Sequence, residues 1–220
     1  GIKGRQVELI VRDDAQSPEK AIAAANELIA ARVEAIIGPD IFVWSSSFMI
    51  KDAGDGAYAS WHQDSHSTRL QGHQMVSAWV ALEAVDSGNG AMRVIPRSHH
   101  DGHRPHGQRR DRLNLVILGE HLDAVDEDAS VDIVLRPGEM SLHHLHVIHG
   151  SPPNTSDRSR IGYAIRYFPT WMNTEGGLSS ALLVRGEDGR WRIALYALTF
   201  PIPNALARDM TARIRAAAAQ

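Results

Sequence analysis

The stretch Ser159-Arg160-Ile161-Gly162-Tyr163-Ala164-Ile165-Arg166-Tyr167 decides the fold, because it alternates between two kinds of side chain. Residues two apart on a β-strand point to the same face of the sheet. One face then carries bulky apolar and aromatic side chains, and the other carries Arg160, Gly162, Ala164 and Arg166. Two guanidinium groups separated by two small residues are not typical of core and leave room for an anion, which a guanidinium can grip by two parallel hydrogen bonds.

Similar short strand-like stretches extend on both sides of this segment, from Ile41 to about Ala197, and glycine, proline and asparagine separate them. We expect strands at Ile41–Ile50, Tyr58–Asp64, Met75–Val85, Ala91–Pro96, Asp132–Leu135, Met140–His144, His146–His149 and Ser159–Phe168. Ser98 to Asp111 has no periodicity and is predicted to be a loop. Many short strands with turn signals between them predict a sandwich or a barrel.

The two ends of the chain differ from this central part. At the N-terminus, a strand at Gln6–Val11, a helix beginning at Ser17-Pro18 and a second strand at Glu34–Ile37, closed by Gly38-Pro39, predict a β-α-β appendage. A helix is expected at Asn204–Ala216. We therefore divide the chain into an appendage (1–40), a β domain (41–198) and a C-terminal helix (199–220).

Composition narrows the possible functions. The 220 residues carry a net charge of −3 with no basic face, which argues against nucleic acid as a partner. No apolar run is long enough to cross a bilayer and no leader opens the chain, so we expect a cytoplasmic protein without a membrane partner. Because the chain has 12 histidines and no cysteine, any metal must be held by imidazole and carboxylate.

A candidate ligand set lies in two short segments. Trp61-His62-Gln63-Asp64 places an imidazole and a carboxylate two residues apart, on one face of a strand. His149 would be the third ligand, and Arg160 follows it eleven residues later. Two imidazoles and one carboxylate form the facial triad of non-haem iron sites. A His-x-Asp pair alone is weak evidence, since so short a pattern arises often by chance.

Longer blocks of sequence make this pattern specific. Trp61-His62-Gln63-Asp64, Ala78-Trp79, Gly88 to His99, Pro137-Gly138-Glu139 and the segment from His149 to Arg160 occur in that order. Over about residues 41–188 the chain resembles the phytanoyl-CoA dioxygenase family of Fe(II)- and 2-oxoglutarate-dependent oxygenases. The resemblance implies a mainly β fold, a double-stranded β-helix (a jelly-roll or cupin-like barrel) with helices on its outside.

The resemblance also implies roles for individual residues. His62, Asp64 and His149 would bind iron, Arg160 would pair with the distal carboxylate of 2-oxoglutarate, Trp79 would lie beside this co-substrate, and Ser151 would be a further contact. The implied reaction is hydroxylation of a small organic substrate by O2, with release of succinate and CO2. Halogenating relatives replace the carboxylate with a small residue, so Asp64 favours hydroxylation.

Other charged and histidine side chains have plainer interpretations. We expect the remaining histidines to lie outside the ligand set, with His144 as the one that could reach the site. The segment His99 to His106 is expected to be a solvated, substrate-facing loop, although it could hold a second metal. Arg166 could contact substrate or pair with a carboxylate, and the sequence does not choose.

Three other functions compete with an oxygenase. A metal hydrolase could use the same two histidines and one aspartate, but Arg160 and Trp79 argue against it. A cupin-like binding module could keep the metal site without turnover. Residues 1–39 resemble a fragment of a periplasmic branched-chain amino-acid binding protein, for example in Ala35-Ile36-Ile37-Gly38-Pro39. About forty residues cannot form a two-lobed ligand cleft, so we expect a structural appendage.

Overall fold

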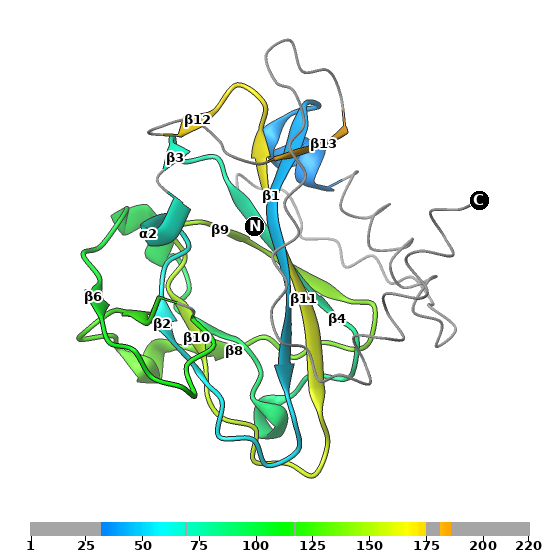
Figure 1. Ribbon diagram of the computed structural model, residues 1–220, viewed down its shortest axis with the longest axis vertical. Coiled ribbons are helices and arrows are strands. Elements are labelled where there is room, and N and C mark those ends of the chain that lie inside the picture. The colour runs from blue at the N-terminus through cyan, green and yellow to red at the C-terminus, as the bar shows by residue number, and fades with distance from the viewer. Residues whose placement is uncertain (1–31, 69, 117, 175–180, 186–220) are drawn as a thin grey trace.

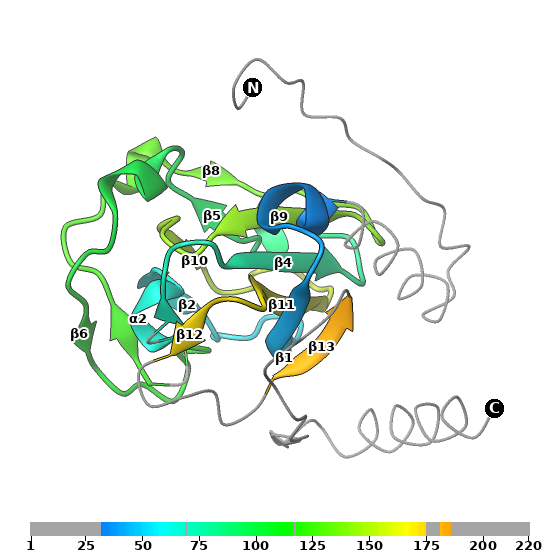
Figure 2. The same cartoon turned by 90° about the horizontal axis from the view of Figure 1, so that it is seen from above.

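Two antiparallel sheets face each other in the computed structural model, which describes residues 32–68, 70–116, 118–174 and 181–185 (Figures 1 and 2). The larger sheet has the order β13 (Leu182–Arg185), β1 (Ile41–Lys51), β11 (Arg160–Pro169), β4 (Val76–Ala81) and β9 (Met140–His144). The smaller has the order β2 (Ala59–His62), β10 (His149–Ser151), β5 (Arg93–Val94) and β8 (Val131–Asp132). This is the predicted mainly β, jelly-roll arrangement.

Short elements join and flank the two sheets. Two further strand pairs are β3 (Leu70–Gln71) with β12 (Asn173–Thr174) and β6 (Gly107–Gln108) with β7 (Glu120–His121). The helical turns are α2 (Ser65–Thr68), η2 (Ser87–Asn89), η3 (Ser98–Asp101) and η4 (Glu127–Ala129). The predicted loop Ser98–Asp111 therefore contains a 3-10 turn and a short strand.

Strand β11 lies at the centre of the larger sheet, between β1 and β4. Its predicted alternation is confirmed. Ile165 and Tyr167 pack in a cluster with Val76, Ala78 and Val80 of β4. The opposite face, with Arg160, Ala164 and Arg166, lines a pocket between the two sheets. One strand thus supplies both hydrophobic core and site, as its sequence indicates.

The predicted second strand of the appendage, Glu34–Ile37, is wrong: residues 32–37 are helical. Val33 and Ile37 lie four residues apart, on one helix face, and both are buried in the cluster on the outer face of the larger sheet. Gly38 ends the helix in a left-handed conformation, with φ +95°, and its N–H donates to the Glu34 carbonyl at 2.9 Å. Gly38-Pro39 is therefore a helix stop rather than a strand stop.

One predicted strand of the β domain is displaced. The sequence predicted a strand at His146–His149, but β10 begins at His149, and the residues before it form a turn in which the Val147 N–H donates to the His144 carbonyl. This turn brings the chain from the larger sheet to the smaller one.

The predictions for Gln6–Val11, for the helix beginning at Ser17 and for Asn204–Ala216 fall outside the described residues. Among the described residues, no helix is both long and apolar enough to span a bilayer.

Candidate active site between the two sheets

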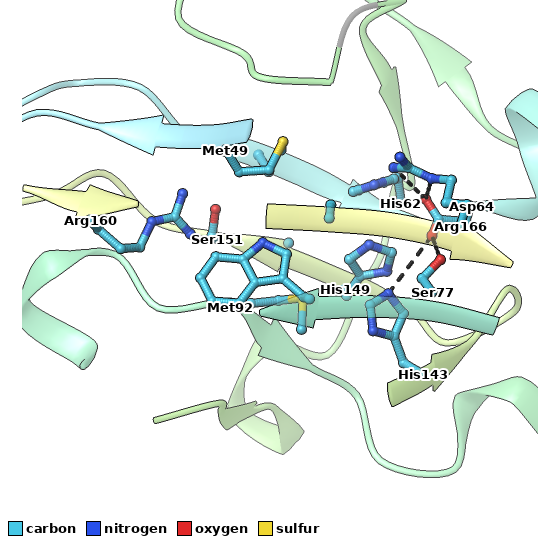
Figure 3. Close-up of a pocket in the computed structure, with 14 residues that line it drawn as sticks. Met49, His62, Asp64, Ser77, Met92, His143, His149, Ser151, Arg160 and Arg166 are labelled. Carbon is cyan, nitrogen blue, oxygen red and sulfur yellow. Dashed lines mark hydrogen bonds and ion pairs between the residues drawn. The ribbon is translucent and has the colours of Figure 1, made fainter. Parts of the chain in front are cut away.

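The pocket between the sheets is lined by side chains from both of them (Figure 3). The larger sheet contributes Met49, Ser77, Trp79, His143, Arg160, Ala164 and Arg166, and the other side contributes Ala59, His62, Asp64, Met92, His149, Gly150 and Ser151. All six predicted site residues are in this set. Arg160 and Ser151 lie toward one end of the pocket, and the three predicted metal ligands lie toward the other.

The structure brings His62, Asp64 and His149 together, with their ligand atoms all within 4.8 Å of one another. His62 and His149 are opposite each other in the β2–β10 register, with ring centroids 4.2 Å apart. Each ring is oriented by its Nδ1, which lies 2.7 Å from the Ser60 carbonyl in His62 and 2.9 Å from the Val147 carbonyl in His149. Nε2 is then the atom presented to a metal, the arrangement usual for histidine ligands.

Asp64 is held as a carboxylate by its surroundings. Burial by itself would raise its pKa, but Arg166 first, and then His143 and His149, hold the pKa well below the ordinary value. Arg166 contacts the Asp64 Oδ1 at 3.2 and 3.3 Å, and the Ser77 hydroxyl donates to Oδ2. Of the two readings of Arg166, pairing with a carboxylate is therefore the one observed.

The two histidines of the set are held in the neutral form. Burial lowers the pKa of His62, and burial together with His62 and His143 puts the pKa of His149 well below its ordinary value. Neutral imidazole is the form that binds metal. At neutral pH the site therefore presents two lone pairs and one negative charge.

Arg160 is buried, at 2% exposure, and its Nε and Nη2 have no hydrogen-bond partner in the described part of the chain. Burial lowers its pKa to about 10, so the side chain stays charged at neutral pH. Its guanidinium lies 5.2 Å from the ring centroid of Trp79. A buried cation with unpaired donors is costly unless an anion compensates it. A ligand carboxylate would satisfy both free nitrogens.

Lys51 is a second buried basic side chain at this end, and the sequence did not indicate its place here. It is opposite Arg160 in the β1–β11 register, is fully buried, and donates to the Ser151 hydroxyl at 2.8 Å and to the Pro152 carbonyl. Burial, followed by the charge of Arg160, lowers its pKa to about 7. The sequence feature that could have identified Lys51 is its position at the end of a strand whose other residues are apolar or carry hydroxyl groups.

His143, and not His144, is the additional histidine in the pocket. His143 is opposite Ser77 in the β4–β9 register, its Nε2 lies 3.8 Å from Asp64 Oδ2, and its ring lies 4.8 Å from that of His149. His144 faces the other way, toward His99 and His146. Alternation alone could not say which of two adjacent histidines points inward, because that depends on the β4–β9 register.

The donor sets at both ends of the pocket fit iron and 2-oxoglutarate. Two imidazoles and one carboxylate suit Fe(II). Arg160, Lys51 and the Ser151 hydroxyl provide donors for a dianionic co-substrate, and the two orphaned nitrogens of Arg160 are otherwise unexplained. One end of the pocket therefore suits a metal and the other suits an anion, and these are called the metal-binding end and the anion-binding end below.

Comparison with known proteins agrees with this description. The sequence model of the phytanoyl-CoA dioxygenase family (PhyH) matches residues 3–162. Peroxisomal phytanoyl-CoA dioxygenase of Bos taurus is 31% identical over 134 residues, covering 58% of this chain and 40% of that protein. L-proline trans-4-hydroxylase of Streptomyces griseoviridis is 25% identical over 197 residues, covering 76% of this chain and 74% of that protein.

A solved structure of a non-heme monooxygenase, ThoJ in its apo form, has a TM-score of 0.68 and 29% sequence identity, covering 95% of this chain and 91% of that one. The chain spans less than half the length of the bovine relative. The family model nevertheless covers most of the chain, including His62, Asp64 and His149 and the start of β11 with Arg160. The chain belongs to the phytanoyl-CoA dioxygenase family of Fe(II)- and 2-oxoglutarate-dependent oxygenases.

Proposed function

We propose that this chain is an Fe(II)- and 2-oxoglutarate-dependent dioxygenase that hydroxylates a small organic substrate and releases succinate and CO2. The observation that carries the proposal is the pairing, in one pocket, of a His-Asp-His set with a buried arginine whose donors are unsatisfied. A metal hydrolase would need the first feature but has no use for the second.

The metal-binding end is assigned to His62, Asp64 and His149. Bound iron(II) and 2-oxoglutarate would supply the activation of O2 and the electrons for inserting one oxygen atom into a C–H bond. The protein's task is to fix the ligands. The Ser60 and Val147 carbonyls orient the two imidazoles, and Arg166 and Ser77 hold the carboxylate.

The anion-binding end is assigned to Arg160, Lys51 and Ser151. The distal carboxylate of 2-oxoglutarate would take up the free Nε and Nη2 of Arg160. Lys51 already donates to the Ser151 hydroxyl, and this bond orients the hydroxyl at the same end. An anion here would also relieve the repulsion between the Lys51 and Arg160 cations, which are neighbours across β1 and β11.

The substrate is proposed to contact the apolar part of the pocket wall. Met49, Met92, Ala59 and Ala164 line the same pocket as the two polar ends. Thioether and methyl surfaces favour an apolar portion of a small molecule and exclude water from the reacting region. These side chains do not select one substrate, and we propose only the class.

The test is an anaerobic titration of the full chain with Fe(II) and then 2-oxoglutarate, following the weak visible charge-transfer band of the chelate. We expect the band in the parent protein and its loss in Asp64→Ala, with folding of both checked by circular dichroism. Succinate release on admission of O2 follows as the turnover assay. If the folded parent gives no band, the chain is a barrel without a working oxygenase site.

A further inference from the structure

A second group of three histidines lies outside the pocket. His66, on α2, and His103 and His106, on the segment that follows η3, each offer a ring nitrogen, and these nitrogens all lie within 4.8 Å of one another. In the described residues, this set and His62, Asp64 and His149 are the two groups with that property. The sequence indicated that the segment His99 to His106 could hold a second metal, but not that His66, which is distant in the chain, joins it.

Two rings of this group, those of His103 and His106, are oriented as metal ligands usually are. His106 Nδ1 lies 2.7 Å from the Arg104 carbonyl, two residues earlier. His62 and His149 use the same arrangement, with a carbonyl two residues earlier holding Nδ1. His103 Nδ1 lies 2.9 Å from the Ser65 hydroxyl. In both His103 and His106 the remaining nitrogen is Nε2, and hydrogen bonding of the opposite nitrogen is typical of metal-binding imidazoles.

We propose that His66, His103 and His106 form a second metal site, which takes a zinc-class ion and joins α2 to the segment carrying His103 and His106. Three imidazoles without a carboxylate favour Zn(II), Ni(II) or Cu(II) over Mg(II) or Ca(II). The set therefore differs in chemistry from the His-Asp-His set in the pocket. One protein would hold two metals in two donor environments.

The site has one competing contact. The Gln63 backbone N–H donates to His106 Nε2 at 2.9 Å, so an ion at His106 replaces this hydrogen bond. Leaving the N–H unpaired costs about tenfold to a hundredfold in affinity. Gln63 is buried between His62 and Asp64, and its side chain also bonds Gly102, Arg104 and His146. These side-chain bonds keep the histidine segment in place while the N–H is exchanged.

The experiment measures zinc stoichiometry on the full chain, by equilibrium dialysis against buffered Zn(II) and elemental analysis. We expect two zinc ions per chain in the parent, because Zn(II) also occupies the pocket set. His103→Ala, His66→Ala and His106→Gln should each bind one. His103 is exposed, so its replacement leaves the fold intact. His100→Ala is the matched control, since this exposed histidine on the adjacent turn η3 is outside the group, and it should still bind two.

Two results would overturn the proposal. One is a single zinc ion in the folded parent, and the other is a second ion that persists in His103→Ala and His66→Ala. If His106→Gln alone keeps the second ion, the three-histidine site is also wrong. His106 is then not a ligand, and in the parent its Nε2 stays the acceptor for the Gln63 N–H. Asp64→Ala separates this site from the pocket, since that variant should lose the pocket ion and keep the other.

Discussion

Trp79 and Gly162 lie on the adjacent strands β4 and β11, and a Cβ atom added at Gly162 would overlap the six-membered ring of the Trp79 indole. The indole of Trp79 therefore occupies the space that a side chain at position 162 would need. The sequence suggested that Gly162 and Ala164 left space for an anion. At Gly162 this interpretation is wrong, because the tryptophan occupies that space.

Gly162→Ala should displace the Trp79 indole from this space and disturb the contact between Trp79 and Arg160. We expect a loss of about 1–3 kcal/mol in the free energy of unfolding and weaker 2-oxoglutarate binding, measured by urea denaturation and by the charge-transfer titration. Gly56→Ala is the control, since its Cβ would meet Leu113 at an ordinary 3.5 Å. Equal effects from both substitutions would contradict the conclusion that Gly162 makes room for the Trp79 indole.

Arg160→Ala should raise the 2-oxoglutarate concentration needed for half-saturation by about a hundredfold, because it removes a buried charge-assisted contact. Arg158→Ala removes a nearby guanidinium that is exposed and bonds Asp86 at 2.6 Å, so it should leave binding unchanged. The anaerobic titration measures both. An unchanged midpoint in folded Arg160→Ala would place the distal carboxylate elsewhere.

His143→Ala should weaken Fe(II) binding by about tenfold to a hundredfold, since His143 supports the Asp64 carboxylate and the His149 ring. His144→Ala changes the next residue, whose ring packs against His99 and His146 on the other face. It should leave iron affinity at the parent level. Competition with a metal-sensitive chelator measures both constants, and the reverse ranking would refute the inward placement of His143.

The Lys51 amine predicts a rise of stability with pH. Its pKa is about 7 in the folded chain and about 10.5 when unfolded. Below pH 7 both states hold the proton. Between these values the unfolded chain binds more protons, so unfolding becomes less favourable as pH increases, by up to about 1.4 kcal/mol per pH unit.

Urea denaturation of the ligand-free chain at pH 7.0 and 8.5 measures this rise. In Lys51→Met the contribution should vanish, so the difference between parent and variant is the quantity to compare. Parallel pH dependences in the two proteins would show that Lys51 keeps an ordinary pKa in the fold.

The helix at residues 32–37 should be part of the folded unit. Ile37→Ala removes a buried side chain and should cost about 2–4 kcal/mol in the free energy of unfolding. Ile36→Ala changes its neighbour, which is 56% exposed, and should stay within about 0.5 kcal/mol of the parent. Similar small effects from both would mean that the helix contributes nothing to the stability of the β domain.

The sequence predicted those features that depend on local pattern. Alternation located β11 and its two faces, and the short blocks around His62, His149 and Arg160 located both ends of the pocket. Features that depend on register were missed. The inward face of β9 follows from the pairing of His143 with Ser77, and Lys51 enters the site only because β1 pairs with β11. The wrong strand at Glu34–Ile37 has a different cause, since Ile36-Ile37 favours a strand locally and packing on the sheet selects a helix.

The opposition of His62 and His149 in neighbouring strands has a consequence for biosynthesis. A nascent chain emerges from the ribosome in sequence order, and β2 is made long before β10. Until residue 149 has emerged, the chain has at most two of the three proposed ligands, and until residue 160 it lacks the proposed co-substrate arginine. If the proposed site is right, metal loading follows synthesis of most of the barrel, and a truncated translation product holds only part of the ligand set.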